Sequence, residues 1–233
     1  MQGFCVYHAI VNKNHYYWLF AIIFLPLIGS ILYLFINVFR KSDIDRAQEN
    51  LTAVINPSGK INDLEKKFKF SQTFENQVRL ADAYLEIEDF DNAIGHYEAS
   101  LKDVFKNDFY VISKLEEAYY FSSRFEKAIN YAERIINNPK FKKSRAAFLY
   151  ALAIEKTGNI VEAETYLKTF DAPYSRYNER LELANFFIRN NKLTEAKILL
   201  TEMVTESEGM TKQSYRQNSL LIKKVKELLA SQE

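Results

Sequence analysis

Cysteine is almost absent from this chain of 233 residues, since Cys5 is the only one. A single thiol excludes an internal disulfide and any zinc site built from Cys-x-x-Cys pairs. The six glycines provide no Gly-rich phosphate-binding loop. The three histidines form no His-Glu-x-x-His motif, and no Gly-x-Ser-x-Gly nucleophile elbow occurs. We therefore expect no cofactor, no metal and no catalytic residue, and the sequence favours a protein that is not an enzyme.

An excess of charge of either sign is also missing. The 31 basic and 30 acidic residues are interspersed and give a formal net charge of +1. A basic group at Lys140, Lys142, Lys143 and Arg145 is typical of a solvated helix start. The sequence therefore predicts no nucleic-acid partner, and no motif indicates a small-molecule substrate. Proteins, peptides and a membrane remain as partners.

One long uncharged run lies near the N-terminus. Tyr16–Phe39 contains 24 residues without a charge, and a helix rising about 1.5 Å per residue would extend over about 36 Å. That length crosses the roughly 30 Å hydrocarbon core of a bilayer. The run exceeds a signal-peptide core and ends in a stop-transfer pattern. We therefore expect a membrane anchor over residues 1–40, with one integral segment.

Part of this run resembles a known membrane module. Residues 25–34 (LPLIGSILYL) are similar to the second membrane helix of the phospholipase-D-nuclease N-terminal module that precedes cardiolipin synthases. The resemblance implies two membrane helices, and residues 1–11 are long enough only for a partial second one. The synthase activity is not implied, because it requires His-x-Lys-x4-Asp motifs and no histidine here begins one.

Basic residues flank the predicted anchor unequally. Arg40, Lys41 and Arg46 follow it, whereas Lys13 alone precedes it. Because basic flanks favour the cytoplasmic side, we expect localisation at a bacterial inner membrane with the remainder in the cytoplasm.

Residues 41–70 are predicted as a helical linker and N-terminal cap. Ser42 suits the N-cap of a first helix over residues 43–55. The Asn-Pro-Ser-Gly run at 56–59 is expected to break that helix. A second helix from Ile61 would cover the start of the following segment with Ile61, Leu64 and Phe68.

A short pattern recurs four times in the rest of the chain. A large apolar residue precedes an alanine by three positions, in Phe90/Ala93, Phe125/Ala128, Ile160/Ala163 and Leu193/Ala196. The alanines follow one another at intervals of 35, 35 and 33 residues. A period near 34 predicts stacked helix-turn-helix units. Short polar breaks at 88–89, 122–124, 157–159 and 190–192 allow each second helix to return antiparallel to the first.

Other positions repeat in phase with these alanines. Twelve residues earlier stand Ala81, Glu116, Ala151 and Ala184, and four residues later stand Tyr97, Ala132, Leu167 and Leu200. Small and large residues at these offsets resemble the tetratricopeptide repeat (TPR) pattern, in which small residues let paired helices touch. Glu116 departs from that pattern. The resemblance covers residues 73–205 and implies a helical solenoid that binds other proteins.

The predicted fold class is therefore all-α. An N-terminal transmembrane helix is followed by a TPR-like helix-turn-helix solenoid and a C-terminal capping helix. We expect four TPR-like repeats over residues 71–205 and the cap over 206–233. Apolar residues recur at helical spacing from Tyr215 to Leu229, and the end of a repeat array needs such a cover.

The resemblance also predicts a binding groove, because the first helices of TPR units line a concave face. By the repeat register, the groove residues are Asp82, Ser113, Glu117, Tyr120, Phe121, Arg145, Phe148, Leu152, Asn185, Ile188 and Arg189. Packing between repeats is the alternative for Phe148, Leu152 and Ile188. An aromatic and aliphatic floor with a few charges suits an extended peptide or a partner helix.

The function predicted from these features is a membrane-anchored TPR scaffold or adaptor that binds a peptide or protein partner near the bilayer. The alternative is a non-catalytic accessory or regulatory subunit of a membrane lipid-metabolism enzyme, recognised through the transmembrane segment.

Overall fold

The structure is a computed structural model that describes residues 57–232. The chain divides into two compact units, Met1–Asp63 and Leu64–Glu233. The predicted transmembrane segment Tyr16–Phe39 and the predicted linker helix over residues 43–55 lie outside the described residues. Over residues 57–232, no helix has both the length and the apolar character needed to cross a bilayer.

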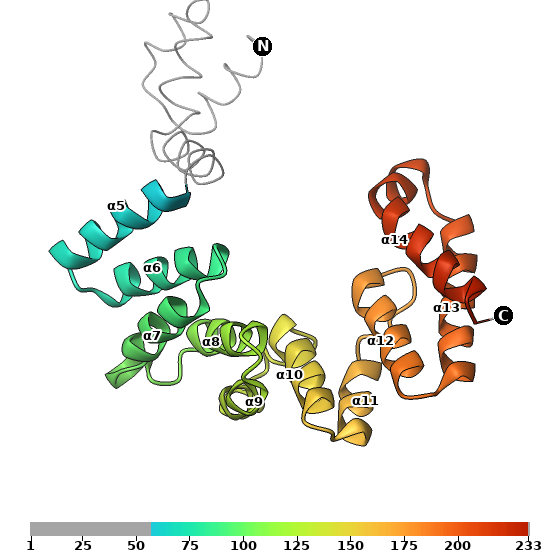
Figure 1. Cartoon of the computed structure of the whole chain (residues 1–233), viewed down its shortest axis with the longest axis horizontal. Coiled ribbons are helices and arrows are strands. Elements are labelled where there is room, and N and C mark those ends of the chain that lie inside the picture. The colour runs from blue at the N-terminus through green and yellow to red at the C-terminus, as the bar shows by residue number, and fades with distance from the viewer. Residues whose placement is uncertain (1–56, 233) are drawn as a thin grey trace, which may run out of the picture. The chain divides into compact units, whose positions relative to one another are not determined.

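The described residues form ten α-helices and one short 3-10 helix, with no strand among them (Figure 1). In chain order the elements are α5 (Pro57–Phe70), α6 (Phe74–Glu86), α7 (Phe90–Ser100), η2 (Asp103–Phe105), α8 (Phe109–Phe121), α9 (Phe125–Glu133), α10 (Arg145–Lys156), α11 (Ile160–Lys168), α12 (Tyr177–Arg189), α13 (Leu193–Glu208) and α14 (Lys212–Ala230). Side chains of Thr73, Asp108, Ser144 and Thr211 cap four of the helices by accepting a hydrogen bond from a backbone N–H of the first turn.

Four consecutive helix pairs make up the array: α6 with α7, α8 with α9, α10 with α11, and α12 with α13 (Figure 1). Each pair reverses at a polar break that the sequence predicted. One residue in each turn has a left-handed backbone, namely Glu88, Ser123, Gly158 or Asn191, with φ between 56° and 92°. The same turn in four places confirms a repeated helix-turn-helix unit.

The four spaced alanines are completely buried in the array. Ala93, Ala128, Ala163 and Ala196 are all 0% exposed. A residue without a long side chain lets two helices approach, and the larger neighbours fill the remaining space. The burial of all four confirms the repeat register that was read from the sequence.

Glu116 is the exception among the small positions. It is 0% exposed, like Ala81, Ala151 and Ala184 at the same place in the other repeats. Neither of its carboxylate oxygens has a hydrogen-bond partner among the described residues. Burial, together with the neighbouring Glu117 carboxylate, raises the pKa of Glu116 well above its ordinary value.

The start of α5 differs from the prediction. We expected residues 56–59 to break the chain before a helix at Ile61, but α5 already begins at Pro57. A proline in the first turn fits a helix, because its fixed φ is helical and the missing N–H would have no partner there. Further along α5, Glu65 accepts a hydrogen bond from Tyr84 of α6 at 2.5 Å, and Phe68 packs edge-on against His96 of α7. This part of α5 therefore packs against the first pair.

The C-terminal end of the array is covered by α14. This helix packs against α13 and α12, with Ile222 and Val225 buried. Tyr215, predicted to share this face, is 42% exposed. The preceding helix α13 ends at Glu208, so it continues into the segment that was assigned to the cap.

Polar side chains link corresponding places of successive repeats. The Tyr131 hydroxyl donates to Glu98 at 2.9 Å, across 33 residues of sequence. The Arg189 guanidinium donates to Glu155 at 2.7 Å, across 34 residues. Arg124 pairs with Asp91 across the same spacing of 33 residues. These contacts form a polar ladder that follows the repeat period and links the first pair to the second and the third pair to the fourth.

Candidate functional site: a groove on the first helices

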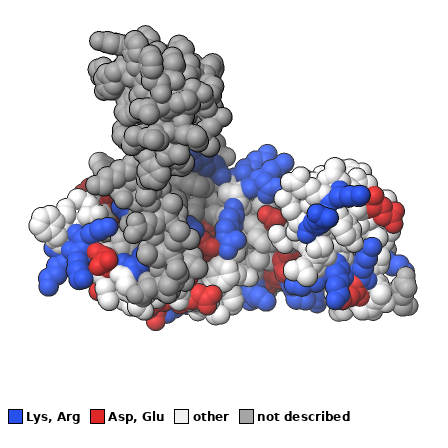
Figure 2. Space-filling view, turned by 90° about the horizontal axis from the view of Figure 1, so that it is seen from above, with Lys and Arg blue, Asp and Glu red and all other residues white. Residues whose placement is uncertain are grey.

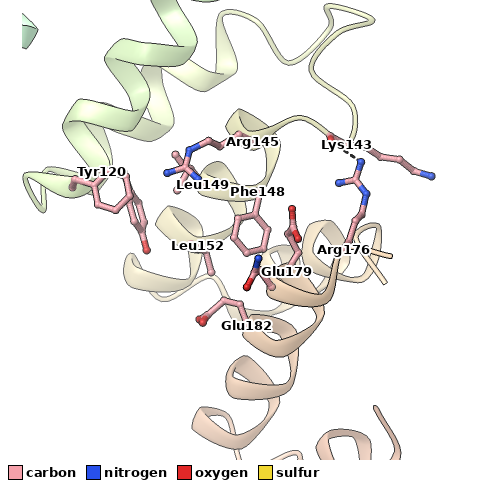
Figure 3. Close-up of a pocket in the computed structure, with 11 residues that line it drawn as sticks. Tyr120, Lys143, Arg145, Phe148, Leu149, Leu152, Arg176, Glu179 and Glu182 are labelled. Atoms are coloured by element: carbon pink, nitrogen blue, oxygen red, sulfur yellow. Dashed lines mark hydrogen bonds between the residues drawn. The ribbon is translucent and has the colours of Figure 1, made fainter. Parts of the chain in front are cut away.

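A cavity of about 570 Å³ opens between α8, α10 and α12, which are the first helices of three consecutive pairs (Figure 3). It is lined by Tyr120, Phe121, Lys143, Arg145, Phe148, Leu149, Leu152, Arg176, Asn178, Glu179 and Glu182. First helices therefore line the face that the repeat register predicted for a groove.

The floor of this cavity is apolar and held by packing. Phe148 lies near the centre of the view in Figure 3, and its ring meets Phe170 edge-on with centroids 5.2 Å apart. Leu149 and Leu152 are 3% and 7% exposed, so they contribute the base of the floor. Tyr120 on α8 adds a second aromatic ring, and its hydroxyl has no hydrogen bond to a described residue. A partly buried aromatic floor suits an apolar side chain of a ligand.

Basic side chains form one rim. Lys143 and Arg176 each stand just before a first helix, with left-handed φ values of 61° and 50°. The Arg176 guanidinium donates to the Lys143 carbonyl oxygen at 3.1 Å, as the dashed line in Figure 3 shows. Arg145 pairs with Glu117 at 2.7 Å and lies over the Phe121 ring at 5.8 Å. These contacts hold the guanidinium groups of Arg145 and Arg176 beside the floor, whereas the Lys143 side chain extends away from Phe148 in Figure 3.

Acidic side chains form a second rim along α12. Glu179 and Glu182 both project from α12 (Figure 3). Glu182 accepts a hydrogen bond from Arg189 at 2.9 Å, and Arg189 also donates to Glu155. Hydrogen bonding to Glu155 raises the pKa of Arg189 further above its ordinary value, so the residue stays charged. Burial, and then the Glu182 and Glu155 carboxylates, raise the pKa of the Tyr120 phenol.

A second cavity of about 280 Å³ lies on α6 and α8 and has an acidic lining. Its residues are Asp82, Leu85, Glu86, Tyr110, Lys114 and Glu117. The Asp82 carboxylate accepts hydrogen bonds from Tyr97 at 2.5 Å and Tyr110 at 3.0 Å. Burial raises the pKa of Asp82, although these two hydrogen bonds act in the opposite direction. Glu117 lines this cavity and pairs with Arg145 of the first one, so the two cavities are adjacent along the same face.

The predicted groove residues divide into three groups. The larger cavity contains Tyr120, Phe121, Arg145, Phe148 and Leu152. Asp82 and Glu117 line the smaller one. The remaining four predicted residues, Ser113, Asn185, Ile188 and Arg189, line neither of these cavities.

Ser113, Asn185, Ile188 and Arg189 make contacts with nearby side chains and backbone groups outside the two cavities. The Ser113 hydroxyl donates to the Phe109 carbonyl oxygen at 2.7 Å, and the Asn185 amide donates to Glu182 at 3.4 Å. Ile188 packs against the core, which was the alternative given for it. Arg189 supports the acidic rim through Glu182.

Sequence reasoning missed most of the charged rim. Lys143, Arg176, Asn178, Glu179 and Glu182 were not among the predicted residues, although all of them line the larger cavity. The sequence signal for them is position: they lie at or just before the N-terminal turns of α10 and α12. Among the described residues, no group of three or more His, Cys, Asp or Glu side chains could hold a metal ion.

No protein-family model matches the sequence, and no curated protein matches it significantly. Solved structures do match its fold. MamA from residue 41 onward, of Desulfovibrio magneticus RS-1, aligns with a TM-score of 0.62 at 14% identity, covering 75% of this chain and 99% of that one.

Two further structures are TPR proteins. TTC0263, a thermophilic TPR protein of Thermus thermophilus, aligns with a TM-score of 0.52 at 18% identity, covering 73% of this chain and 92% of that one. YrrB, described as a TPR protein with an unusual peptide-binding site, aligns with a TM-score of 0.51 at 10% identity over the same shares. The described part of this chain therefore has the fold of a TPR-type helical solenoid.

Proposed function

We propose that the chain is a scaffold that binds a peptide segment of a protein partner in the groove on α8, α10 and α12. The observation that carries this proposal is the larger cavity, whose aromatic floor is bordered by basic and acidic side chains. The fold supports it, since TPR-type neighbours include a protein with a peptide-binding site. The predicted segment Tyr16–Phe39 would hold the scaffold at a bacterial inner membrane, with the array in the cytoplasm.

The charges around the groove define the peptide that would fit. A bulky apolar side chain would pack on Phe148. An acidic group on one side of it would face Arg176, and a basic group on the other side would face Glu182. A second basic residue would suit the acidic cavity around Asp82. Such alternation of charge sets the direction of the bound peptide more than its affinity.

Selection from a random peptide library against the purified full-length chain tests the proposal. We expect enriched peptides to carry a bulky apolar residue with an acidic residue on one side and a basic residue on the other. Substitution of Arg176 by glutamate should weaken their binding about tenfold or more, because it places like charges together at the rim. Lys142→Glu is the control for the change of charge, since this exposed residue lines neither of the two cavities described above. Equal binding by both variants would contradict the proposal.

A second candidate function rests on the likeness of residues 25–34 to the module that precedes cardiolipin synthases. In that case the chain would be a non-catalytic accessory or regulatory subunit of a membrane lipid-metabolism enzyme, recognised through its membrane segment. Exchange of Tyr16–Phe39 for an unrelated transmembrane helix separates the two functions. The scaffold would keep its peptide binding and cellular role, whereas the accessory subunit would lose its role and keep the peptide binding.

A further inference from the structure

We propose that one end of the repeat array binds the surface of an anionic lipid bilayer. The surface consists of the C-terminal part of α5, the turn into α6, and the η2 segment between α7 and α8; we call it the basic-aromatic end. This proposal is separate from the peptide groove, because none of its residues lines either cavity described above.

Large apolar side chains are exposed at the basic-aromatic end. Phe70, the last residue of α5, is 93% exposed, and Val104 in η2 is 88% exposed. Phe105 is 39% exposed, and its ring stacks on Phe74 at the start of α6 with centroids 3.8 Å apart and planes within 8°. That stack brings the two segments together. Exposed aromatic and aliphatic side chains of this kind enter the interfacial layer of a bilayer.

Hydrogen bonds hold the η2 segment in a defined outward turn. Asp103 has a left-handed φ of 50°, and the Phe105 N–H donates to the Lys102 carbonyl oxygen at 2.9 Å. The Asp108 N–H then donates to the Phe105 carbonyl oxygen at 2.9 Å, and the Asp108 side chain caps α8. Val104 therefore sits at the tip of an ordered turn, and binding would order few additional groups.

Lysines lie close in sequence to these apolar side chains. Lys66, Lys67 and Lys69 lie beside Phe70 in sequence, and Lys102 and Lys106 flank η2. All five are exposed. Only three acidic residues, Glu75, Asp103 and Asp108, fall within residues 66–75 and 102–108. Figure 2 shows a group of basic side chains next to uncharged surface at its left edge, the side on which α5 ends in Figure 1.

The combination favours a lipid surface over a protein groove as the occupant. The apolar side chains are exposed and have exposed lysines next to them in sequence, a combination that lets an interfacial residue enter the bilayer while lysines reach anionic headgroups. Each lysine close to an anionic membrane surface strengthens binding about fivefold. Five lysines against three carboxylates thus complement an anionic leaflet.

An environment-sensitive dye on the full-length chain tests this contact. In a Cys5→Ala background, Val104→Cys places the dye at the tip of η2, and Val161→Cys places it on α11 at a valine that is 79% exposed. Each chain is reconstituted with phosphatidylcholine alone or with added phosphatidylglycerol. We expect the dye at 104 to shift its emission to the blue and to be quenched by brominated lipid only with phosphatidylglycerol. The dye at 161 should stay in water in both lipids.

Removal of charge gives an independent readout. The double variant Lys102→Gln with Lys106→Gln should lower the ratio of membrane-bound to free dye at position 104 about 25-fold, because each lysine contributes a factor of about five. Lys197→Gln, at an exposed lysine on α13, should leave that ratio unchanged. A dye at 104 that stays in water with anionic lipid would overturn the proposal, as would equal shifts at 104 and 161. A lipid-independent shift at 104 that grows with protein concentration would also overturn it and would indicate a protein contact.

Discussion

Glutamine in place of Glu116 should change how the stability of the array depends on pH. The wild-type carboxyl is 0% exposed, and neither oxygen has a hydrogen-bond partner among the described residues. The folded state therefore favours the protonated form, and the pKa of Glu116 is raised well above 4.5 by burial first and by Glu117 second. Glutamine has nearly the same shape but carries no titratable proton.

The sign and size follow from proton linkage. Above pH 4.5, the ordinary value of this carboxyl, the unfolded chain releases the proton while the folded chain keeps it. Stability is therefore fully present below that pH and falls as pH rises toward the folded pKa. The loss is at most about 1.4 kcal/mol for each pH unit in this window. Between pH 5 and pH 7, it can thus approach about 3 kcal/mol for this single carboxyl.

Urea denaturation of the full-length chain, followed by circular dichroism at several pH values, measures the effect. We expect the free energy of unfolding of Glu116→Gln, relative to wild type, to increase from pH 5 to pH 7 by up to about 3 kcal/mol. Glu126→Gln, at an exposed position on α9, is the matched control and should show no such trend. Parallel pH profiles for Glu116→Gln and wild type would refute the reasoning.

Three other substitutions test the packing. Ala128→Glu should lower the free energy of unfolding by several kcal/mol, roughly 3–5, because it buries a charge at a helix contact that is 0% exposed, and an unchanged thermal melt would contradict the repeat register. Arg180→Met should lower the free energy of unfolding, measured by urea denaturation, by about 3–5 kcal/mol. Arg180 is fully buried, and its loss leaves the buried Glu206 carboxylate without the guanidinium that lies 2.8 Å away. The double variant Arg180→Met with Glu206→Met should recover part of the lost stability. Burial lowers the pKa of His96 below 6.5. The contribution of His96 to stability is therefore full above pH 6.5 and falls as the pH drops toward the folded pKa. His96→Phe should remove this fall, which is measured as the slope of the unfolding free energy against pH below 6.5.

The periodic spacing of the alanines was sufficient to predict the repeat fold from the sequence. Ala93 and its three counterparts mark helix contacts whose spacing is fixed by the unit length, so their burial could be read from intervals alone. The start of α5 could not, because proline either breaks a helix or begins one, and the local sequence around Pro57 is compatible with both. Glu116 was visible as a departure from the pattern, and its complete burial depended on how closely the neighbouring helices pack.

The groove was predicted in part for a related reason. Phe148 and Leu152 lie on the face of α10 that the register selects, so both were found. Lys143 and Arg176 precede their helices with a left-handed backbone. Glycine or asparagine usually marks such a backbone in a sequence, and neither residue stands at these positions. The place of Lys143 and Arg176 at the cavity depends on how α10 and α12 stack, and a single-helix register contains no information on that stacking.

The polar ladder between repeats has a mechanical consequence. Within the described residues, the helix contacts join neighbouring or next-but-one helices, so the array is a series of joints without a common centre. Arg145 and Glu117 span the joint between α8 and α10, and the larger cavity lies across the same joint. A small rotation there would move Tyr120 and Phe121 of α8 relative to Phe148 of α10, so the width of this cavity depends on the angle between two successive repeats.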